Sequence, residues 1–461
     1  MSKSQLPDVL IPVNKTTMSN VDIYTSVLEP VNKSQKRLIF NIRQQGILNA
    51  GSRLVMSIHP SDAASSAAGD CFLPLTAGIA ACIDSAVLRA GTKVLARTEK
   101  FGKFYAMKKS VHTSSQKQNI DMVLDGGVVN CGPSPNTDGL LAIDTGSAIY
   151  VNKTTASVPD KYKPVASETE CPTFSVALSD LFPMMRGMML PVFAMAEQVS
   201  VEINLTQQAN PQTGKTIMFR NAPGTTTATT YALNNFAMHL DYLEYDMKSM
   251  ANIRAEVDGD GMPMKYPDIA LTTTQLISPG GVGTGTTSTI TDVREVGTAG
   301  MKVNNIMVVE NNGLANPLAG VYRSDAMIHP PHFNWRVNDK IIYPRKLTNT
   351  SHMRNEMEQI LEFPMSVANG EYKNGKQNIV FDAGVNMMGQ ASSVISGNYF
   401  ITGLNLRKGP GGEGTDVINK NVLYERDTTY SFNDQQSRTI DFFVEHERSF
   451  ILKGGVVLTS A

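Results

Sequence analysis

Strict alternation of apolar and polar residues is the dominant pattern along the chain. The clearest run, Val199–Leu205, places its apolar side chains on one face and its polar ones on the other. The same period recurs in segments bounded by Gly, Pro, Asn or Asp: Leu38–Ile42, Leu54–Ile58, Phe236–Tyr242, Met301–Val309, Ile341–Tyr343, Tyr399–Leu406, Ile440–Val444 and Gly455–Thr459. These runs predict an all-β protein built from sandwiches.

Helical spacing is confined to three short segments. One predicted helix is capped by Ser179 and carries Pro183 in its first turn, where the missing N–H is tolerated. The other two begin near Ser351 and after Asp246. The apolar residues at helical spacing are Leu181, Met184, Met185 and Met188 in the first, Met353, Met357, Ile360 and Leu361 in the second, and Met247, Met250 and Val257 in the third.

Two large β units suit the chain better than three average domains. A predicted helix and the turn-rich Asp258–Pro263 separate the strand ending near Asp246 from a new strand at Ile269–Leu271. We expect an N-terminal arm over residues 1–35, a first jelly roll over 36–246, a linker with a short helix over 247–267 and a second jelly roll over 268–461. Long loops are expected over residues 125–172, 207–230, 279–300 and 408–421.

The composition narrows the functional classes. Of the 461 residues, 41% are hydrophobic and only 18% are charged, which allows a large core and excludes wholesale disorder. The 41 Lys+Arg against 42 Asp+Glu exclude a generic nucleic-acid binder, which carries a strongly basic surface. A net charge near zero promotes association, so it suits copies that pack edge to edge.

The cysteines and the apolar stretches indicate the compartment. The cysteines lack a CxxC spacing and are interpreted as small buried side chains in a reducing compartment: Cys71, Cys82, Cys131 and Cys171. Met1–Pro7 contains no apolar signal segment, and the longest apolar stretch, Gly187–Ala196, is shorter than the ~18–20 residues that span a bilayer. We expect no signal peptide and no transmembrane segment.

Motifs for ligand binding are incomplete wherever they occur. Gly280–Thr287 is rich in glycine but lacks the lysine of a phosphate-binding loop, and its continuation through Ile290 predicts a strand. Asp258–Gly261 begins like a calcium loop, but the later ligand positions hold Met and Ile, which leaves a turn. His329 and His332 flank two prolines and have no further metal ligands nearby, which favours a rigid loop.

The remaining candidate side chains each have a structural interpretation. Asp241, Glu244 and Asp246 offer paired carboxylates for glycoside hydrolysis, yet Asp241 fits the polar face of a strand, and His446 has no nucleophile motif to serve. A methionine run is interpreted as core or subunit contact, and lysines interleaved with aromatics as a half-exposed segment or a nucleic-acid contact. These two groups are Met184, Met185, Met188, Met189 and Met195, and Lys100, Phe101, Lys103, Phe104, Tyr105, Lys108 and Lys109. We assign no catalytic, cofactor-binding or metal-binding residue.

Four blocks carry a family resemblance through their order and spacing. They are Leu75–Ile79 with Val87–Gly91, Leu181–Met184 with Leu190–Val192 and Val199–Leu205, Asp241–Asp246 with Tyr266–Asp268, and Asn334–Pro344. In this order the blocks resemble the double jelly-roll major capsid proteins of tailless icosahedral DNA viruses, and they look closest to those of polinton-like viruses and virophages. The resemblance spans roughly residues 75–344.

The resemblance implies a structural protein that is not an enzyme and needs no cofactor. Three chains would form a pseudo-hexagonal capsomer, and capsomers would tile an icosahedral virion shell around double-stranded DNA. Expected partners are further copies of the chain, penton and minor capsid or cement proteins, and a host receptor at the outer loops. The arm over residues 1–35 is expected to contact neighbouring or minor capsid proteins or the inner shell. Sequence-specific nucleic-acid binding is not expected.

Two other functional classes stay open at this level. A virion-attached or secreted carbohydrate-binding protein, such as a spike or lectin, would explain jelly rolls without an active site. It predicts aromatic platforms on loops, whereas the sole tryptophan, Trp335, lies in a strand-like run. A glycoside hydrolase on a sandwich needs two carboxylates about 5–10 Å apart, and Asp241 or Glu244 would then be essential.

Overall fold

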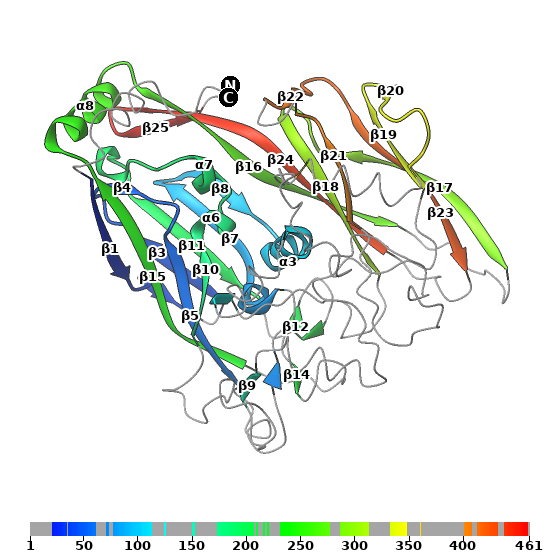
Figure 1. The fold of residues 1–461 in the computed structure, drawn as a ribbon, viewed down its shortest axis with the longest axis horizontal. Helices are drawn as coiled ribbons and strands as arrows, with labels where there is room; N and C mark the ends of the chain where they lie inside the picture. Colours follow the sequence, from blue (N-terminus) through cyan, green and yellow to red (C-terminus); the bar gives the residue numbers. More distant parts are fainter. Residues whose placement is uncertain are drawn as a thin grey trace, which may run out of the picture.

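Antiparallel strand pairs build four large sheets, and the sheets face one another in two sandwiches that stand side by side (Figure 1). The structure is a computed structural model. It describes residues 21–34, 36–60, 71–72, 77–112, 124–125, 150–152, 173–206, 209–210, 215–216, 219–220, 231–276, 286–312, 332–347, 360, 401–407, 413–431 and 438–459. The all-β class predicted from the alternating pattern is confirmed.

The first sandwich consists of two sheets, each named here after a central strand. The β15 sheet has the order β1-β15-β5-β10, with β4 also paired to β15, and the β11 sheet has the order β2-β3-β11-β7-β8. The strands are β1 Asp22–Leu28, β2 Asn32–Lys33, β3 Arg37–Asn41, β4 Ile47–Leu48, β5 Arg53–Pro60, β7 Ile83–Ala90, β8 Lys93–Thr98, β10 Thr173–Ala177, β11 Val199–Leu205 and β15 Tyr231–Glu244.

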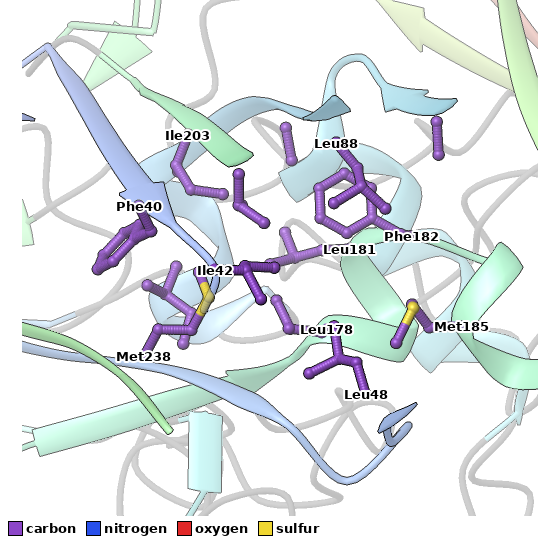
Figure 2. Packing of buried hydrophobic residues seen from close by; sticks show 14 of the residues in the cluster. Phe40, Ile42, Leu48, Leu88, Leu178, Leu181, Phe182, Met185, Ile203 and Met238 are labelled. Atoms are coloured by element: carbon purple, nitrogen blue, oxygen red, sulfur yellow. The ribbon is translucent and has the colours of Figure 1, made fainter. Parts of the chain in front are cut away.

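Alternating residues of both sheets fill the first core. Every second residue of β11 from Val199 to Leu205 is buried, as the sequence predicts. Phe40 and Ile203 from the β11 sheet converge with Met238 from the β15 sheet (Figure 2). Because each such side chain contributes about 1.5–3 kcal/mol on full burial, a one-residue register slip that turned a strand over would be strongly unfavourable.

The second sandwich repeats this plan. The β24 sheet has the order β16-β24-β18-β21, with β22 paired to β18 and β25 paired to β24, and the β23 sheet has the order β17-β23-β19-β20. The strands are β16 Met262–Leu276, β17 Thr287–Val296, β18 Lys302–Asn312, β19 His332–Val337, β20 Lys340–Ile341, β21 Ile401–Asn405, β22 Thr415–Asp416, β23 Val422–Ser431, β24 Arg438–Lys453 and β25 Val456–Thr459. Two small sheets join β12 Ala209–Asn210 to β13 Lys215–Thr216, and β14 Phe219–Arg220 to β6 Cys71–Phe72 and β9 Tyr150–Asn152.

Aromatic side chains dominate the second core. The ring centroids of Trp335 on β19 and Tyr424 on β23 lie 4.9 Å apart, and Tyr424 meets Phe442 on the facing β24 at 5.7 Å. All three side chains are fully buried. Such tilted and edge-on ring pairs are stabilising beyond the area they bury, so this cluster fixes how the two sheets face each other.

Strands β16 and β24 belong to both cores. They pair without a break from Met262, opposite Leu452, to Leu276, opposite Arg438. Met264 and the C-terminal end of β24 lie in the first core. Ile269 and the N-terminal end of β24 lie in the second core. The linker expected over residues 247–267 therefore contains the beginning of a strand that both sandwiches share.

Short helices connect the strands, and one of them differs from the prediction. Instead of a single helix capped by Ser179, the chain forms α6 (Leu178–Leu181) and α7 (Met184–Gly187), and Ala177 precedes α6. The break has a local cause, because a residue before proline is pushed into extended backbone, and Phe182 adopts φ −127° and ψ 102° before Pro183. The helix predicted after Asp246 is confirmed as α8 (Met247–Asp258). Two 3₁₀ turns span Gly78–Cys82 and Val192–Ala194.

Two expected segments contain more strand structure than the sequence predicted there, and a third is described at one residue. Strands β1 and β2 lie within the arm expected over residues 1–35, and Tyr24 and Leu28 pack against the first core. Strand β17 occupies much of the long loop expected over residues 279–300. Of the helix expected from Ser351, only Ile360 lies among the described residues, where it is helical and buried.

Candidate functional site

Helix α3 (Phe101–His112) joins the two sandwiches and lies between them in Figure 1. Phe101 and Ala106 belong to the first core, whereas Phe104 and Met107 belong to the second. The rings of Phe104 and Phe443 on β24 are 5.3 Å apart. The helix thus inserts two apolar faces into two different cores, and separating the sandwiches would expose both faces.

A buried ion cluster lies beside this helix. The Asp441 carboxylate on β24 is fully buried, and it accepts hydrogen bonds from Lys100 Nζ at 2.6 Å, from Thr273 Oγ1 at 2.7 Å and from Lys103 Nζ. Lys103 is only 4% exposed. Burial acts to raise the pKa of Asp441, but the charges of Lys103 and Lys100 outweigh it and hold the pKa below its ordinary value. The carboxylate therefore stays ionised and connects the first sandwich to the second.

The edge of β8 in the first sandwich is held by side chains from β16 and β24. The carbonyl oxygen of Leu95 accepts hydrogen bonds from the Tyr266 hydroxyl at 2.7 Å and from Arg448 Nη1 at 3.2 Å. Arg448 also contacts Asp268 Oδ2 at 2.8 Å. Burial raises the pKa of Tyr266 to about 12, so this hydroxyl remains a donor at any physiological pH.

The β24–β25 hairpin makes a third connection. The carbonyl of Gly455 accepts a hydrogen bond from the Ala196 amide at 2.7 Å, and the Val457 amide donates to Glu197 Oε2 at 3.2 Å. Lys93 Nζ donates to the carbonyl of Val457 and lies 3.7 Å from Glu197 Oε1. Helix, ion cluster and hairpin thus connect the two sandwiches at three places.

The solvent face of the β23 sheet carries a ladder of paired charges. Lys346 Nζ contacts Glu425 at 3.1 Å and Asp427 at 2.7 Å, and Arg336 contacts Glu425 at 2.6 Å. The hydrogen bond from Lys346 lowers the pKa of Glu425. For Asp427, burial acts to raise the pKa, but hydrogen bonds from Lys346 and Thr291 bring it below its ordinary value. These charges neutralise one another and leave a polar but charge-balanced surface.

The candidate carboxylates do not assemble into a hydrolase site. Asp241 and Glu244 are three residues apart on β15, so they point to opposite faces of the sheet. Asp241 accepts a hydrogen bond from Thr25 Oγ1 at 2.7 Å, and Asp246 accepts one from Ser249 Oγ at 2.5 Å just before α8. Asp241 and Asp246 therefore stabilise the local structure. Trp335 is fully buried and offers no platform for a sugar ring.

The other sequence candidates also occupy structural positions. His446 is buried, and that burial lowers its pKa despite the nearby charge of Asp268. His332 is exposed on β19, while His329 lies outside the described residues. Cys82 is buried, as expected. Of the methionine run, four members lie in the first core and Met189 is exposed. Across the described ranges, no group of three or more His, Cys, Asp or Glu side chains could hold a metal ion.

The segment of interleaved lysines and aromatics differs in part from the expectation. Phe101, Lys103 and Phe104 are buried between the sandwiches and are not available to nucleic acid. Lys100, Tyr105 and Lys108 are half-buried, as expected. Within the part of the chain that the structure describes, no helix has the length and apolar character needed to cross a membrane.

The chain is similar to known proteins in structure but not in sequence. No family model matches the sequence, and no curated protein sequence matches it. Solved structures match nearly the whole chain. PBCV-1 VP54, fitted into a reconstruction of the virophage Sputnik, is 10% identical, with 96% of this chain and 97% of that chain covered and a TM-score of 0.56. A structure of the Sputnik virophage is 12% identical, with coverages of 95% and 88% and a TM-score of 0.55. The Faustovirus major capsid protein is 11% identical, with coverages of 95% and 91% and a TM-score of 0.55. The chain has the double jelly-roll fold.

Sequence reasoning missed the residues that join the two jelly rolls. One signal was present, because Asp441 interrupts the apolar run Ile440–Val444 and a lone acid inside such a run indicates a buried charge that needs a partner. Its partners Lys100, just before α3, and Lys103, on α3, are more than 300 residues away, and no local pattern indicates them. Arg448 and Glu197 carry no distinguishing signal in the sequence.

Proposed function

We propose that this protein is the major capsid protein of an icosahedral virus. The observation that carries the proposal is the fold: two connected jelly rolls that resemble viral capsid structures along nearly the whole chain. A shell subunit must hold its shape while it is contacted on several sides, and the buried Asp441 cluster and helix α3 supply that rigidity. No catalytic role is assigned to any side chain.

The proposed capsomer is a homotrimer. Each chain contributes two sandwiches of similar plan, so three chains place six sandwiches around one axis and give a pseudo-hexagonal outline. Such units can tile an icosahedral shell that encloses double-stranded DNA. The balance of 41 basic and 42 acidic residues supports close packing of many copies, because little net repulsion accumulates between them.

Further partners belong to the same proposal. Penton and minor capsid or cement proteins would contact the edges and the inner face of the shell, and outer loops would meet a host receptor. The protein would act in the virion after assembly inside the host cell. Residues 1–20 precede β1 and are proposed to contact neighbouring or minor capsid proteins. Their deletion should impair shell assembly while leaving the trimer intact, and normal assembly without them would contradict this role.

Mass measurement of the purified chain tests the proposal. A stable species of three times the 50.1 kDa chain mass, with a hexagonal outline in electron micrographs, is the expected result. A monodisperse monomer at micromolar concentration would count against a capsid role.

A further inference from the structure

Most edge strands of the four sheets are too short to pair extensively with another chain. An edge strand presents unpaired backbone N–H and C=O groups, which are a template for a further strand. Strands β2 and β20 each span two residues, and β10 and β21 each span five. Short edges of this kind are a common protection in monomeric proteins.

The edge strands at the junction are largely occupied within the chain. Strand β8 has its Leu95 carbonyl bound by Tyr266 and Arg448, and β25 has both backbone groups of Val457 bound by side chains of the first jelly roll. Strand β16 contains Pro263 and Pro267, which cannot donate to a further strand, so its first half is closed to an outside partner. Its second half, Asp268–Leu276, lies beside the junction, where Lys100 contacts Thr273.

Away from the junction, two long edges remain among the described strands, β1 with seven residues and β17 with ten. Within this part of the chain, β1 pairs only with β15, and β17 pairs only with β23. Among the described residues, no hydrogen bond reaches their outer backbone groups. Neither strand contains proline or lysine, which commonly protect an edge. Both expose apolar side chains to solvent, with Ile23 68%, Val27 56% and Val293 51% exposed.

These two edges lie at opposite ends of the long axis of the molecule, one on each jelly roll (Figure 1). A ring of three copies needs two different, complementary surfaces, because a contact of one surface with itself closes at a dimer. The chain offers two such open edges. We propose that β1 of one copy adds to the β17 edge of the next copy, which extends the β23 sheet across the subunit boundary. This inference rests on the proposed homotrimer.

The two strands fit by length and by side-chain pattern. At about 3.3 Å per residue, β1 is roughly 23 Å long, and the ten residues of β17 can pair with all of it. Pairing would satisfy the open backbone groups and shield Ile23, Val27 and Val293 from water. Backbone hydrogen bonds would provide the attachment, while the alternating side chains would set the register.

Lysine substitutions on β1 and β17 test the proposed contact between copies. In the full-length chain, Val27→Lys and Val293→Lys should each raise the concentration at which trimers dissociate at least tenfold, as measured by mass photometry. Met247→Lys is the matched control, because Met247 is an 88% exposed apolar residue on α8, away from both edges, and its trimer should be unchanged. Monomer melting temperatures should match wild type for all three. Unchanged trimers in both edge variants would overturn the inference.

Cross-linking distinguishes pairing of unlike edges from pairing of like edges. A Val27→Cys and Val293→Cys double variant treated with a short bis-maleimide should give covalent trimers, whereas each single variant should give only the background of the wild-type cysteines. Covalent dimers from a single variant, or no linkage in a trimeric double variant, would refute β1–β17 pairing while leaving the proposed function intact. A wild-type monomer would contradict both proposals.

Discussion

The substitution Asp441→Asn probes the connection between the two jelly rolls most sharply. It removes one charge and keeps the side-chain shape. In the wild type, Lys100 Nζ and Thr273 Oγ1 lie 2.6 Å and 2.7 Å from Asp441 Oδ1, and Lys103 contacts Oδ2. The substitution leaves two ammonium groups of the first jelly roll beside a neutral amide of the second.

The magnitude follows from burial. Asp441 is fully buried and Lys103 nearly so, and breaking a buried pair by removing one charge typically costs about 3–5 kcal/mol. Lys103→Met should cost less, because Lys100 and Thr273 still contact the carboxylate. With a urea m-value of about 3 kcal/mol/M, the D441N midpoint should fall by roughly 1–1.7 M.

Urea unfolding followed by two probes is the assay. Fluorescence of the sole tryptophan, Trp335, reports the second core, and far-ultraviolet circular dichroism reports both sandwiches. The two transitions should coincide in the wild type, because α3 and β16 contribute side chains to both cores. In D441N the midpoint should fall, and the two transitions should separate if the weakened junction lets one jelly roll unfold first.

Control variants decide whether burial is the cause. Glu99→Gln breaks the pair with Arg97, whose side chains are 39% and 60% exposed, and should cost no more than about 1 kcal/mol. A D441N loss of less than 1 kcal/mol, or a K103M loss larger than that of D441N, would refute the reasoning.

Three further predictions concern packing, acid and a turn. Phe104→Ala should lower unfolding free energy by about 3–5 kcal/mol in tryptophan-monitored urea titrations, since its ring fills the second core from the first jelly roll. Folding lowers the pKa values of Glu425 and Asp427, so their contribution to stability is complete above about pH 5, above both ordinary values. It should be lost as the pH falls through the lowered pKa values, which urea midpoints between about pH 7 and pH 3 would measure. Gly455→Ala should cost more in thermal melts than Gly300→Ala: both have φ +74°, but only at Gly455 would a Cβ meet backbone, at 2.7 Å.

The alternating strands were predictable from the sequence because burial on one face of a strand leaves a local signal. The run Val199–Leu205 predicts which side chains face inward, and the structure confirms it. In Ile440–Val444 the alternation is wrong, because all five side chains are buried, Asp441 and Phe443 included. Helix α3 was not predictable in the same way. The helix packs against two cores, so it has two apolar faces instead of one. In the sequence, Lys103 and Phe104 therefore resemble an ordinary mixed surface, and only their contacts with the distant β24 show that both are buried.

The sequence also did not predict which strands form the edges of the sheets. The sequence predicts a strand through Ile290 inside an expected loop over residues 279–300, but the extent of β17 to Val296 is set by its pairing with β23. Which strands end a sheet depends on pairing between distant segments, as in the antiparallel match of Asp22 with Glu244. Such non-local information is absent from the local hydrophobic pattern.

The mass of the assembled species tests the central claim most directly. Mass photometry of the full-length chain across nanomolar to micromolar concentrations, with electron microscopy of the main peak, should show particles of three 50.1 kDa chains with a hexagonal outline. A single monomeric species over the whole range would contradict the account.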